Sequence, residues 1–312
     1  MAALELKPAQ LSDIVADSDR FPLRVPHSFV SRMKKGEPND PLLRQVLPLN
    51  VENEFTPGYL SDPVGDLNAS ETPGLLHKYR GRALLITTGA CAIHCRYCFR
   101  RHFPYGQQNA AANEWDSALS KIERDSSLSE VILSGGDPLA LSDQRLTTLI
   151  RRLDRIPHLR RLRIHTRLPV VIPQRVCDSL LTWLSNTRLS PVIVIHTNHP
   201  SEIDEDVRVA LAKLQTIRGI TLLNQSVLLK GVNDCSETLA ALSEALFACG
   251  VHPYYLHLLD RAQGTAHFDL PAEQAIAIFN ELHAQLPGYL VPRLVQEQPG
   301  APGKTLLAAK SI

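Results

Sequence analysis

The stretch ALLITTGACAIHCRYCFRR, residues 83–101, joins an apolar run directly to a loop with three cysteines. The run at 83–88 is apolar and β-branched, which is typical of a buried β-strand. Cys91, Cys95 and Cys98 follow it with the spacing CxxxCxxC. The stretch therefore predicts a strand whose carboxyl end carries three thiols in one short loop.

The pattern of this strand is repeated along the rest of the chain, where apolar runs alternate with amphipathic segments. We predict strands at residues 83–88, 130–135, 161–166, 191–197, 221–229 and 253–259. Helices are predicted near residues 115–124, 142–155, 173–185, 203–217, 236–249 and 271–285. Each later strand begins about 30 residues after the one before, the length of one βα unit. The expected fold is α/β, with six right-handed βα units that curl into a partial, TIM-like (β/α)6 barrel.

The two ends of the chain differ from this regular middle. Residues 1–75 are proline-rich and irregular, so we expect an N-terminal extension that wraps the barrel. Residues 76–312 are expected to form the barrel and a C-terminal loop. An apolar run at 288–296 leads into EQPGAPGKT, where glycine and proline exclude regular structure.

Composition and charge restrict the class of protein. The 312 residues are 44% hydrophobic and 21% charged, as in an ordinary globular chain, and the net charge of +1 predicts no general attraction to nucleic acid or membranes. No apolar run reaches the ~18 residues of a membrane span, and the start is too acidic for a secretory signal. The basic run at 151–167, with seven arginines, can be a docking patch, but a solvated helix end is the simpler interpretation. We therefore expect a cytoplasmic protein with reduced thiols.

The cysteine loop indicates a metal or redox site. Three thiolates can hold three corners of a cubane [4Fe-4S] cluster, which leaves one iron open to another ligand. Zinc is the alternative, with His94 or His102 as a further ligand, although structural zinc sites usually close with four paired ligands. The other cysteines are interpreted as structural residues: Cys177, Cys235 and Cys249.

Further polar residues follow the predicted strands. SGGDPL at 134–139 ends the second strand, His196 and Asn198 end the fourth, and Asp260 follows the sixth. Lys304 lies beyond the last apolar run. Because the carboxyl ends of parallel strands meet at one face of a barrel, these side chains are expected to converge there.

The cysteine motif after the first strand of a six-unit βα pattern resembles the radical S-adenosylmethionine superfamily. The resemblance implies that S-adenosylmethionine chelates the open iron of a cluster held by the three cysteines. SGGDPL is similar to the glycine-rich segment that approaches the methionine amino group in that superfamily. The residues implied for binding S-adenosylmethionine are Ser134, Gly135, Gly136, Asp137 and His196.

Additional motifs resemble one branch, the lysine 2,3-aminomutases. HKYRGR at 77–82, VIHTNHPSEI, NQSVLLKGVND, PYYLHLLD and PGAPGKT occur in the order of that family, and the likeness extends from about residue 45. The resemblance implies a second cofactor, pyridoxal 5′-phosphate, held by Lys304. Tyr79 and Arg82 match positions that contact this cofactor and its phosphate, and Lys78 stands where the closest relatives would have arginine.

Charged residues match the substrate contacts of this family. Arg100 matches the residue that binds the substrate carboxylate, and a guanidinium fork suits that group. Asp260 and Glu297 match the acids that bind the ε-ammonium of lysine, although Glu297 stands in place of an aspartate. Arg101 is expected to solvate or support the cysteine loop.

The resemblance implies an isomerase that converts L-α-lysine to (R)-β-lysine. An electron from the reduced cluster cleaves S-adenosylmethionine, the resulting 5′-deoxyadenosyl radical removes a β-hydrogen, and the amino group moves from C2 to C3. Flavodoxin or ferredoxin is the expected electron donor.

The short chain resembles the bacterial subgroup whose product modifies translation elongation factor P through a β-lysine ligase. One alternative is an aminomutase for another amino acid, or a radical enzyme without pyridoxal phosphate. The other is a non-catalytic redox-sensing protein with iron–sulfur or zinc in the cysteine loop.

Overall fold

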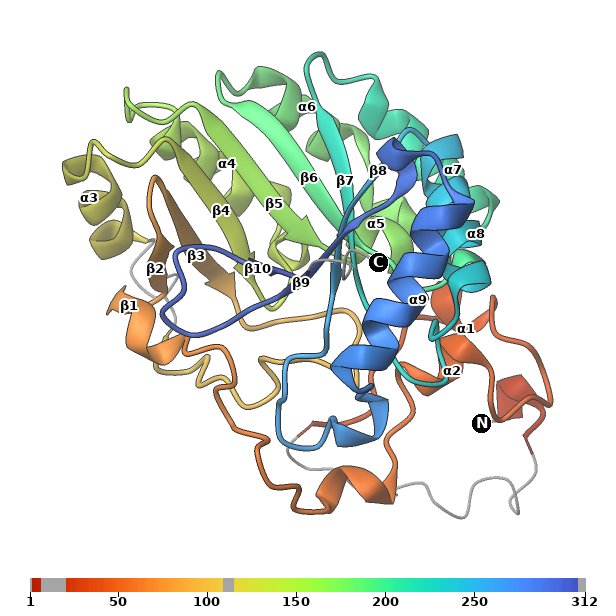
Figure 1. Cartoon of the computed structure of the whole chain (residues 1–312). Helices are drawn as coiled ribbons and strands as arrows, with labels where there is room; N and C mark the ends of the chain where they lie inside the picture. The colour runs from red at the N-terminus through yellow and green to blue at the C-terminus, as the bar shows by residue number, and fades with distance from the viewer. Residues whose placement is uncertain (1, 7–20, 109–114, 308–312) are drawn as a thin grey trace.

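The computed structural model describes residues 2–6, 21–108 and 115–307, and these form one curved, open β-sheet with helices on its outer face (Figure 1). Among these residues the sheet has ten strands, ordered β1 to β10 as in the sequence. Strands β3 to β9 pair in parallel, whereas β1–β2, β2–β3 and β9–β10 are antiparallel. The strands are β1 Ser70–Thr72, β2 Leu75–Tyr79, β3 Arg82–Thr88, β4 Glu130–Gly135, β5 Arg161–Thr166, β6 Ser190–His196, β7 Thr221–Val227, β8 His252–His257, β9 Arg293–Gln296 and β10 Thr305–Leu306.

The parallel strands alternate with helices that cover the sheet (Figure 1). The helices are α1 His27–Val30, α2 Pro41–Arg44, α3 Asp116–Arg124, α4 Asp143–Leu153, α5 Leu168–Val171, α6 Asp178–Asn186, α7 Glu205–Gln215, α8 Ser236–Ala248 and α9 Ala272–Gln285. The six predicted strands and the predicted partial barrel are therefore confirmed.

The hydrophobic pattern accounts for these elements. All six residues of β4 are buried, because a central parallel strand is covered on both faces. In α7, Val207, Ala210, Leu211 and Leu214 form the buried face, and the side chain of Asp204 caps the helix by accepting a hydrogen bond from the Val207 N–H at 3.0 Å.

The structure also corrects the sequence prediction in two places. The helix predicted at 173–185 begins only at Asp178, because the backbone leaves the helical conformation at Val176 and is extended at Cys177. The one-turn helix α5 and a 3-10 turn, Pro173–Arg175, fill the space before it. The strands β1, β2, β9 and β10 extend the sheet beyond the six predicted strands.

The N-terminal segment lies along the end of the sheet where the parallel strands terminate (Figure 1). Phe29, Leu42 and Val46 belong to the same buried hydrophobic cluster as barrel residues such as Leu133 and Ile164. Residues 7–20 of the predicted extension lie outside the described residues, and the division at residue 75 stays a prediction. None of the described helices is both long and apolar enough to cross a bilayer.

Candidate active site

The loops at the carboxyl ends of the strands surround one cavity of about 490 Å³. This volume falls in the range of small-molecule sites. All the residues predicted to bind a cofactor or the substrate line it, whereas Arg101 and His102 do not: Tyr79, Arg82, Cys91, Cys95, Cys98, Arg100, Ser134, Gly135, Gly136, Asp137, His196, Asp260, Glu297 and Lys304. Tyr79 and Arg82 enter from the β2–β3 hairpin, where they face each other across the turn. The expected convergence of these residues is therefore present in the structure.

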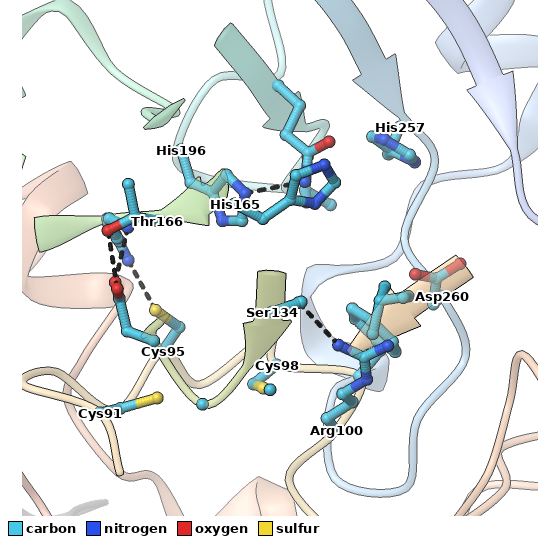
Figure 2. Close-up of a pocket in the computed structure, with 18 of the residues that line it drawn as sticks. Cys91, Cys95, Cys98, Arg100, Ser134, His165, Thr166, His196, His257 and Asp260 are labelled. Carbon is cyan, nitrogen blue, oxygen red and sulfur yellow. Dashed lines mark hydrogen bonds between the residues drawn. The ribbon is translucent and has the colours of Figure 1, made fainter. Parts of the chain in front are cut away.

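The three cysteines lie on one side of this cavity, and His196, His257 and Asp260 lie on the other (Figure 2). Burial, followed by the neighbouring thiolate of Cys95, raises the pKa of Cys98 to about 11. Burial also raises the pKa of Cys91 well above its usual value. A bound metal displaces such protons, since the thiolate is the ligand.

The spread of the cysteines fits a cluster better than a single zinc ion. Among the described residues, no three His, Cys, Asp or Glu side chains converge closely enough to hold one metal ion. Zinc needs its thiolates about 2.3 Å from one point, whereas a cubane presents separate iron atoms. The rings of His94 and His102 instead contact the backbone carbonyls of Pro22 at 2.8 Å and Gln263 at 3.0 Å.

The glycines of SGGDPL allow two loops to pack closely. Gly135 has a φ of +125°, and a Cβ at Gly135 or Gly136 would collide with the backbone carbonyl of Thr88 or Ala90. The Gly136 N–H donates to the Thr88 carbonyl at 2.7 Å. Side chains larger than hydrogen would therefore separate this segment from the cysteine loop.

Asp137 and His196 are held by neighbouring strands. The carboxylate of Asp137 accepts hydrogen bonds from the Thr166 hydroxyl at 2.7 Å and from the Arg167 N–H at 2.7 Å. His196 Nε2 lies 2.9 Å from the amide nitrogen of Gln225. Burial, followed by the positive charges of Arg167 and Arg100, lowers the pKa of His196 to about 3, so its ring is neutral.

Arg100 is held by a carboxylate from the N-terminal segment. Its Nε donates to Asp66 at 2.6 Å, and its Nη1 donates to the Ser134 hydroxyl at 3.0 Å. Asp66 also pairs with Lys78 Nζ at 2.6 Å. Burial opposes ionisation of Asp66, but the charges of Arg100 and Lys78 hold its pKa below the ordinary value. The hydrogen bonds to Asp66 and Ser134 are made by Nε and Nη1 of Arg100. Nη2 takes part in neither of them and can donate to an incoming carboxylate.

Two lysine amines meet at Glu297. Lys304 Nζ lies 2.7 Å from one carboxylate oxygen of Glu297, and Lys78 Nζ lies 3.0 Å from the other. Burial alone would raise the pKa of Glu297, but these two ammonium groups lower it to about 2. Glu297 therefore stays ionised between the two amines.

The surroundings of the two amines differ. Lys78 contacts two carboxylates and also donates to the Val64 carbonyl at 2.8 Å, so three acceptors surround its amine. Lys304 contacts one carboxylate and lies 5.8 Å above the ring of Tyr255. A lysine must lose its proton before it can bond to a carbonyl, so Lys304 is the better placed of the two.

Asp260 and two histidines provide further polar groups near Lys304. Burial, followed by the charge of Glu297, raises the pKa of Asp260 to about 7. His165 Nε2 and His257 Nε2 are buried and have no hydrogen-bond partner in the described part of the chain. Because a buried polar atom without a partner is costly, these atoms point to a polar ligand that completes their bonding. The chemistry of this side of the cavity thus fits a polar aromatic cofactor bound near Lys304.

Sequence reasoning missed several of these residues. Asp66 lies in the irregular stretch SDPVGDL, and His165 and His257 lie inside ordinary strand patterns. The sequence presents Arg167 only as the last arginine of the basic run at 151–167. For the histidines, an imidazole near the carboxyl end of a parallel strand was an available signal, whereas Asp66 had none.

We expect Asp66→Asn to destabilise the protein by about 3–5 kcal/mol, because it leaves Arg100 buried without its counter-charge. Denaturant unfolding measures this. The pKa of Asp66 is lower in the folded protein than its ordinary value of 3.8. The ionised carboxylate therefore stabilises the fold at neutral pH, and this stabilisation is lost as the pH falls below 3.8. Asp116→Asn is the control, because the Asp116 carboxylate is 67% exposed in its pair with Arg152 and should contribute at most about 1 kcal/mol. Equal unfolding midpoints for the two variants would contradict this role of Asp66.

Comparisons with known proteins define the class. Residues 80–160 match the family model of a 4Fe-4S single cluster domain. The fold is similar to that of Streptococcus suis SuiB bound to S-adenosylmethionine, with a TM-score of 0.51, 12% identity, and coverage of 71% of this chain and 51% of that chain. At this identity the likeness concerns the fold alone. The partial barrel and the CxxxCxxC loop inside the matched segment define the class: an α/β partial-barrel protein with an iron–sulfur cluster motif after its first parallel strand.

Sequence relatives define the family. The L-lysine 2,3-aminomutase of Haemophilus influenzae is 49% identical over 308 residues, which cover 99% of this chain and 91% of that protein. The protein of the same name from Escherichia coli is 48% identical over 320 residues, which cover 96% of this chain and 93% of that protein. The Clostridium subterminale protein is 38% identical over 279 residues, covering 89% and 66%. The chain belongs to the L-lysine 2,3-aminomutase family and is an isomerase, as its motifs predicted.

Proposed function

We propose that this protein converts L-α-lysine to (R)-β-lysine with a [4Fe-4S] cluster, S-adenosylmethionine and pyridoxal phosphate. The observation that carries the proposal is the single cavity that joins the cysteine loop, Lys304, Arg100 and Asp260. The relatives from Haemophilus influenzae and Escherichia coli, both named L-lysine 2,3-aminomutase, support the same reaction. Neither a zinc site nor a redox sensor requires these further groups around the cysteines.

The residues of the cavity divide between the cofactors. Cys91, Cys95 and Cys98 would hold the cluster, and the segment 134–137 with His196 would bind S-adenosylmethionine. Lys304 would hold pyridoxal phosphate, with Tyr79 and Arg82 as further contacts; the Arg82 guanidinium lies 4.6 Å above the Tyr79 ring. When bound, the cluster and S-adenosylmethionine supply radical hydrogen abstraction, and pyridoxal phosphate supplies conjugation for the migrating amino group.

The charges in the cavity favour an amino acid with a cationic side chain. Arg100, held by Asp66 and Ser134, presents a fixed guanidinium to the substrate carboxylate. Asp260 presents a carboxyl group whose pKa is about 7, and an arriving ammonium stabilises its ionised form. Glu297 is paired with Lys304 and Lys78, and it becomes available to the substrate when Lys304 bonds to the cofactor.

Anaerobic reconstitution tests the proposal. The protein is loaded with iron and sulfide, given S-adenosylmethionine, pyridoxal phosphate and a chemical reductant, and incubated with L-lysine. Chiral product analysis should detect (R)-β-lysine. Protein that carries both cofactors but converts glutamate or a neutral amino acid better than lysine would contradict the proposed substrate.

We expect Asp260→Asn to lower kcat/KM for lysine by about 10- to 150-fold. This fold-change corresponds to the free energy of one hydrogen bond to a charged group, about 1.5–3 kcal/mol. In the wild-type enzyme, kcat/KM for lysine should rise as the pH increases through about 7, because Asp260 ionises there; the variant should lose this rise.

Norleucine, which lacks the ε-ammonium, is the control substrate. Its residual conversion or its binding should change little in the Asp260→Asn variant. An equal loss for lysine and norleucine would show that Asp260 maintains the cavity and does not bind the ammonium.

We propose further that the product serves the modification of elongation factor P through a β-lysine ligase in the cytoplasm, with flavodoxin or ferredoxin as the electron donor. The resemblance of the sequence motifs to the elongation factor P subgroup supports this role. Deletion of the gene should remove the β-lysyl mass from elongation factor P, and supplied (R)-β-lysine should restore it. If elongation factor P in the deletion strain stayed unmodified after (R)-β-lysine was supplied, this role would be contradicted.

A further inference from the structure

Arg167 contacts a cysteine of the proposed cluster site. Of the arginines in residues 151–167, all of which the structure describes, Arg167 alone is buried, with 4% of its surface exposed. It directly follows β5, and its Nη1 lies 2.7 Å from Cys95 Sγ. Figure 2 shows this contact as the dashed line that ends on the sulfur of Cys95. A guanidinium at this distance donates a charge-assisted hydrogen bond to a thiolate.

A buried network holds the guanidinium in place. Arg167 Nη2 donates to Gln45 Oε1 at 2.7 Å and to Glu202 Oε2 at 2.9 Å. The other carboxylate oxygen of Glu202 accepts hydrogen bonds from the Asn198 N–H at 2.9 Å and from Gln45 Nε2 at 3.1 Å. The side chains of Gln45 and Glu202 are fully buried. These bonds hold the Arg167 guanidinium toward Cys95.

The cysteine loop is therefore asymmetric. At Cys91 the contact from a cationic side chain is made to the backbone, since Arg24 Nη1 donates to its carbonyl at 3.0 Å. At Cys98 the backbone N–H donates to the Cys95 carbonyl at 3.0 Å. In the described part of the chain, Cys95 is the cysteine of this loop whose sulfur accepts a hydrogen bond from a cationic side chain.

We propose that Arg167 is a positioning residue that raises the reduction potential of the cluster through Cys95, and that Glu202 partly offsets its charge. The inference rests on the proposed cluster at the three cysteines. One electron enters the cluster on reduction and no bond in the protein breaks, so the reduced state carries one more negative charge. Hydrogen bonds and positive charge at a ligand sulfur stabilise that state and make reduction easier.

A redox titration of reconstituted protein tests this proposal. Arg167→Gln keeps a neutral donor but removes the charge, so at a fixed applied potential the ratio of reduced to oxidised cluster should fall about tenfold. A tenfold change corresponds to a shift of 59 mV for a one-electron couple. Glu202→Gln removes the opposing charge, so the ratio should rise. Iron and sulfide contents are measured first, and visible or paramagnetic resonance spectra then report the ratio.

Arg175→Gln is the matched control. Arg175 also contacts a cysteine, since its Nη1 lies 3.6 Å from Cys177 Sγ, and it pairs with Asp143 at 2.8 Å, but neither Arg175 nor Cys177 lines the cavity. The cluster of the Arg175→Gln variant should therefore have the same midpoint potential as that of the wild type. If Arg167→Gln loads poorly, the loaded fraction still reports its own midpoint, and Arg167→Lys, which keeps the charge, should retain most of the wild-type value.

The possible results separate the two proposals. An iron-loaded Arg167→Gln variant with an unchanged midpoint would overturn the role of Arg167 and leave the proposed function intact. Shifts in the same direction for Arg167→Gln and Glu202→Gln would indicate general loosening and would also overturn it. Wild-type protein that takes up zinc and no iron would overturn the proposed function itself.

Discussion

Replacing any one of Cys91, Cys95 or Cys98 with alanine should abolish lysine conversion. A cubane held by three thiolates has no spare protein ligand, so the loss of one leaves two irons without a cysteine. Since the cofactors carry the hard chemistry, the loss of turnover should approach the whole rate enhancement, at least about 10⁶-fold. Iron analysis and the visible spectrum after anaerobic reconstitution measure the cluster directly, separately from turnover.

Cys177→Ala is the matched control for this prediction. Cys177 is partly buried, lies directly before α6, and contacts Asp143 at 3.6 Å, away from the cavity. This variant should keep full iron content and full turnover. A Cys91→Ala protein that retains a complete cluster and a spectral response to S-adenosylmethionine would show that the loop is not the cluster ligand.

Replacing Lys304 with alanine should have the second largest effect. The variant would lose the amine proposed to hold pyridoxal phosphate, and turnover should fall on the order of 10³- to 10⁶-fold, as for other residues that bond covalently in catalysis. In the wild type, borohydride reduction should fix the cofactor on the peptide that contains Lys304. Peptide mass analysis locates the label.

Lys78 is the internal comparison for this labelling experiment. Both amines contact Glu297, but Lys78 also contacts Asp66 and the Val64 carbonyl, which hold its amine away from a bound cofactor's carbonyl group. Lys78→Ala protein should therefore still be labelled at Lys304. A label on Lys78 in the wild type, or full labelling of Lys304→Ala, would show that the wrong lysine was assigned.

The fold could be predicted from local patterns because each βα unit is formed by consecutive residues of the sequence. Apolar runs such as 130–135 and 161–166 predicted β4 and β5 with the bounds that the structure has. Strands without such a pattern could not be predicted in this way. β10 has two residues and β1 has three, and both owe their extended form to pairing with a neighbouring strand.

The candidate site divides in the same way. The sequence by itself determined that the cysteine loop, SGGDPL, Asp260 and Lys304 lie at one end of the barrel, because in a parallel barrel every loop that follows a strand faces the same end. Only the tertiary structure decided their partners. Arg167 and Glu202 are 35 positions apart, and Asp66 and Arg100 are 34 apart, in segments with no shared pattern. Such pairs form because a buried charge must find a counter-charge, and which one lies within reach depends on how the whole chain packs.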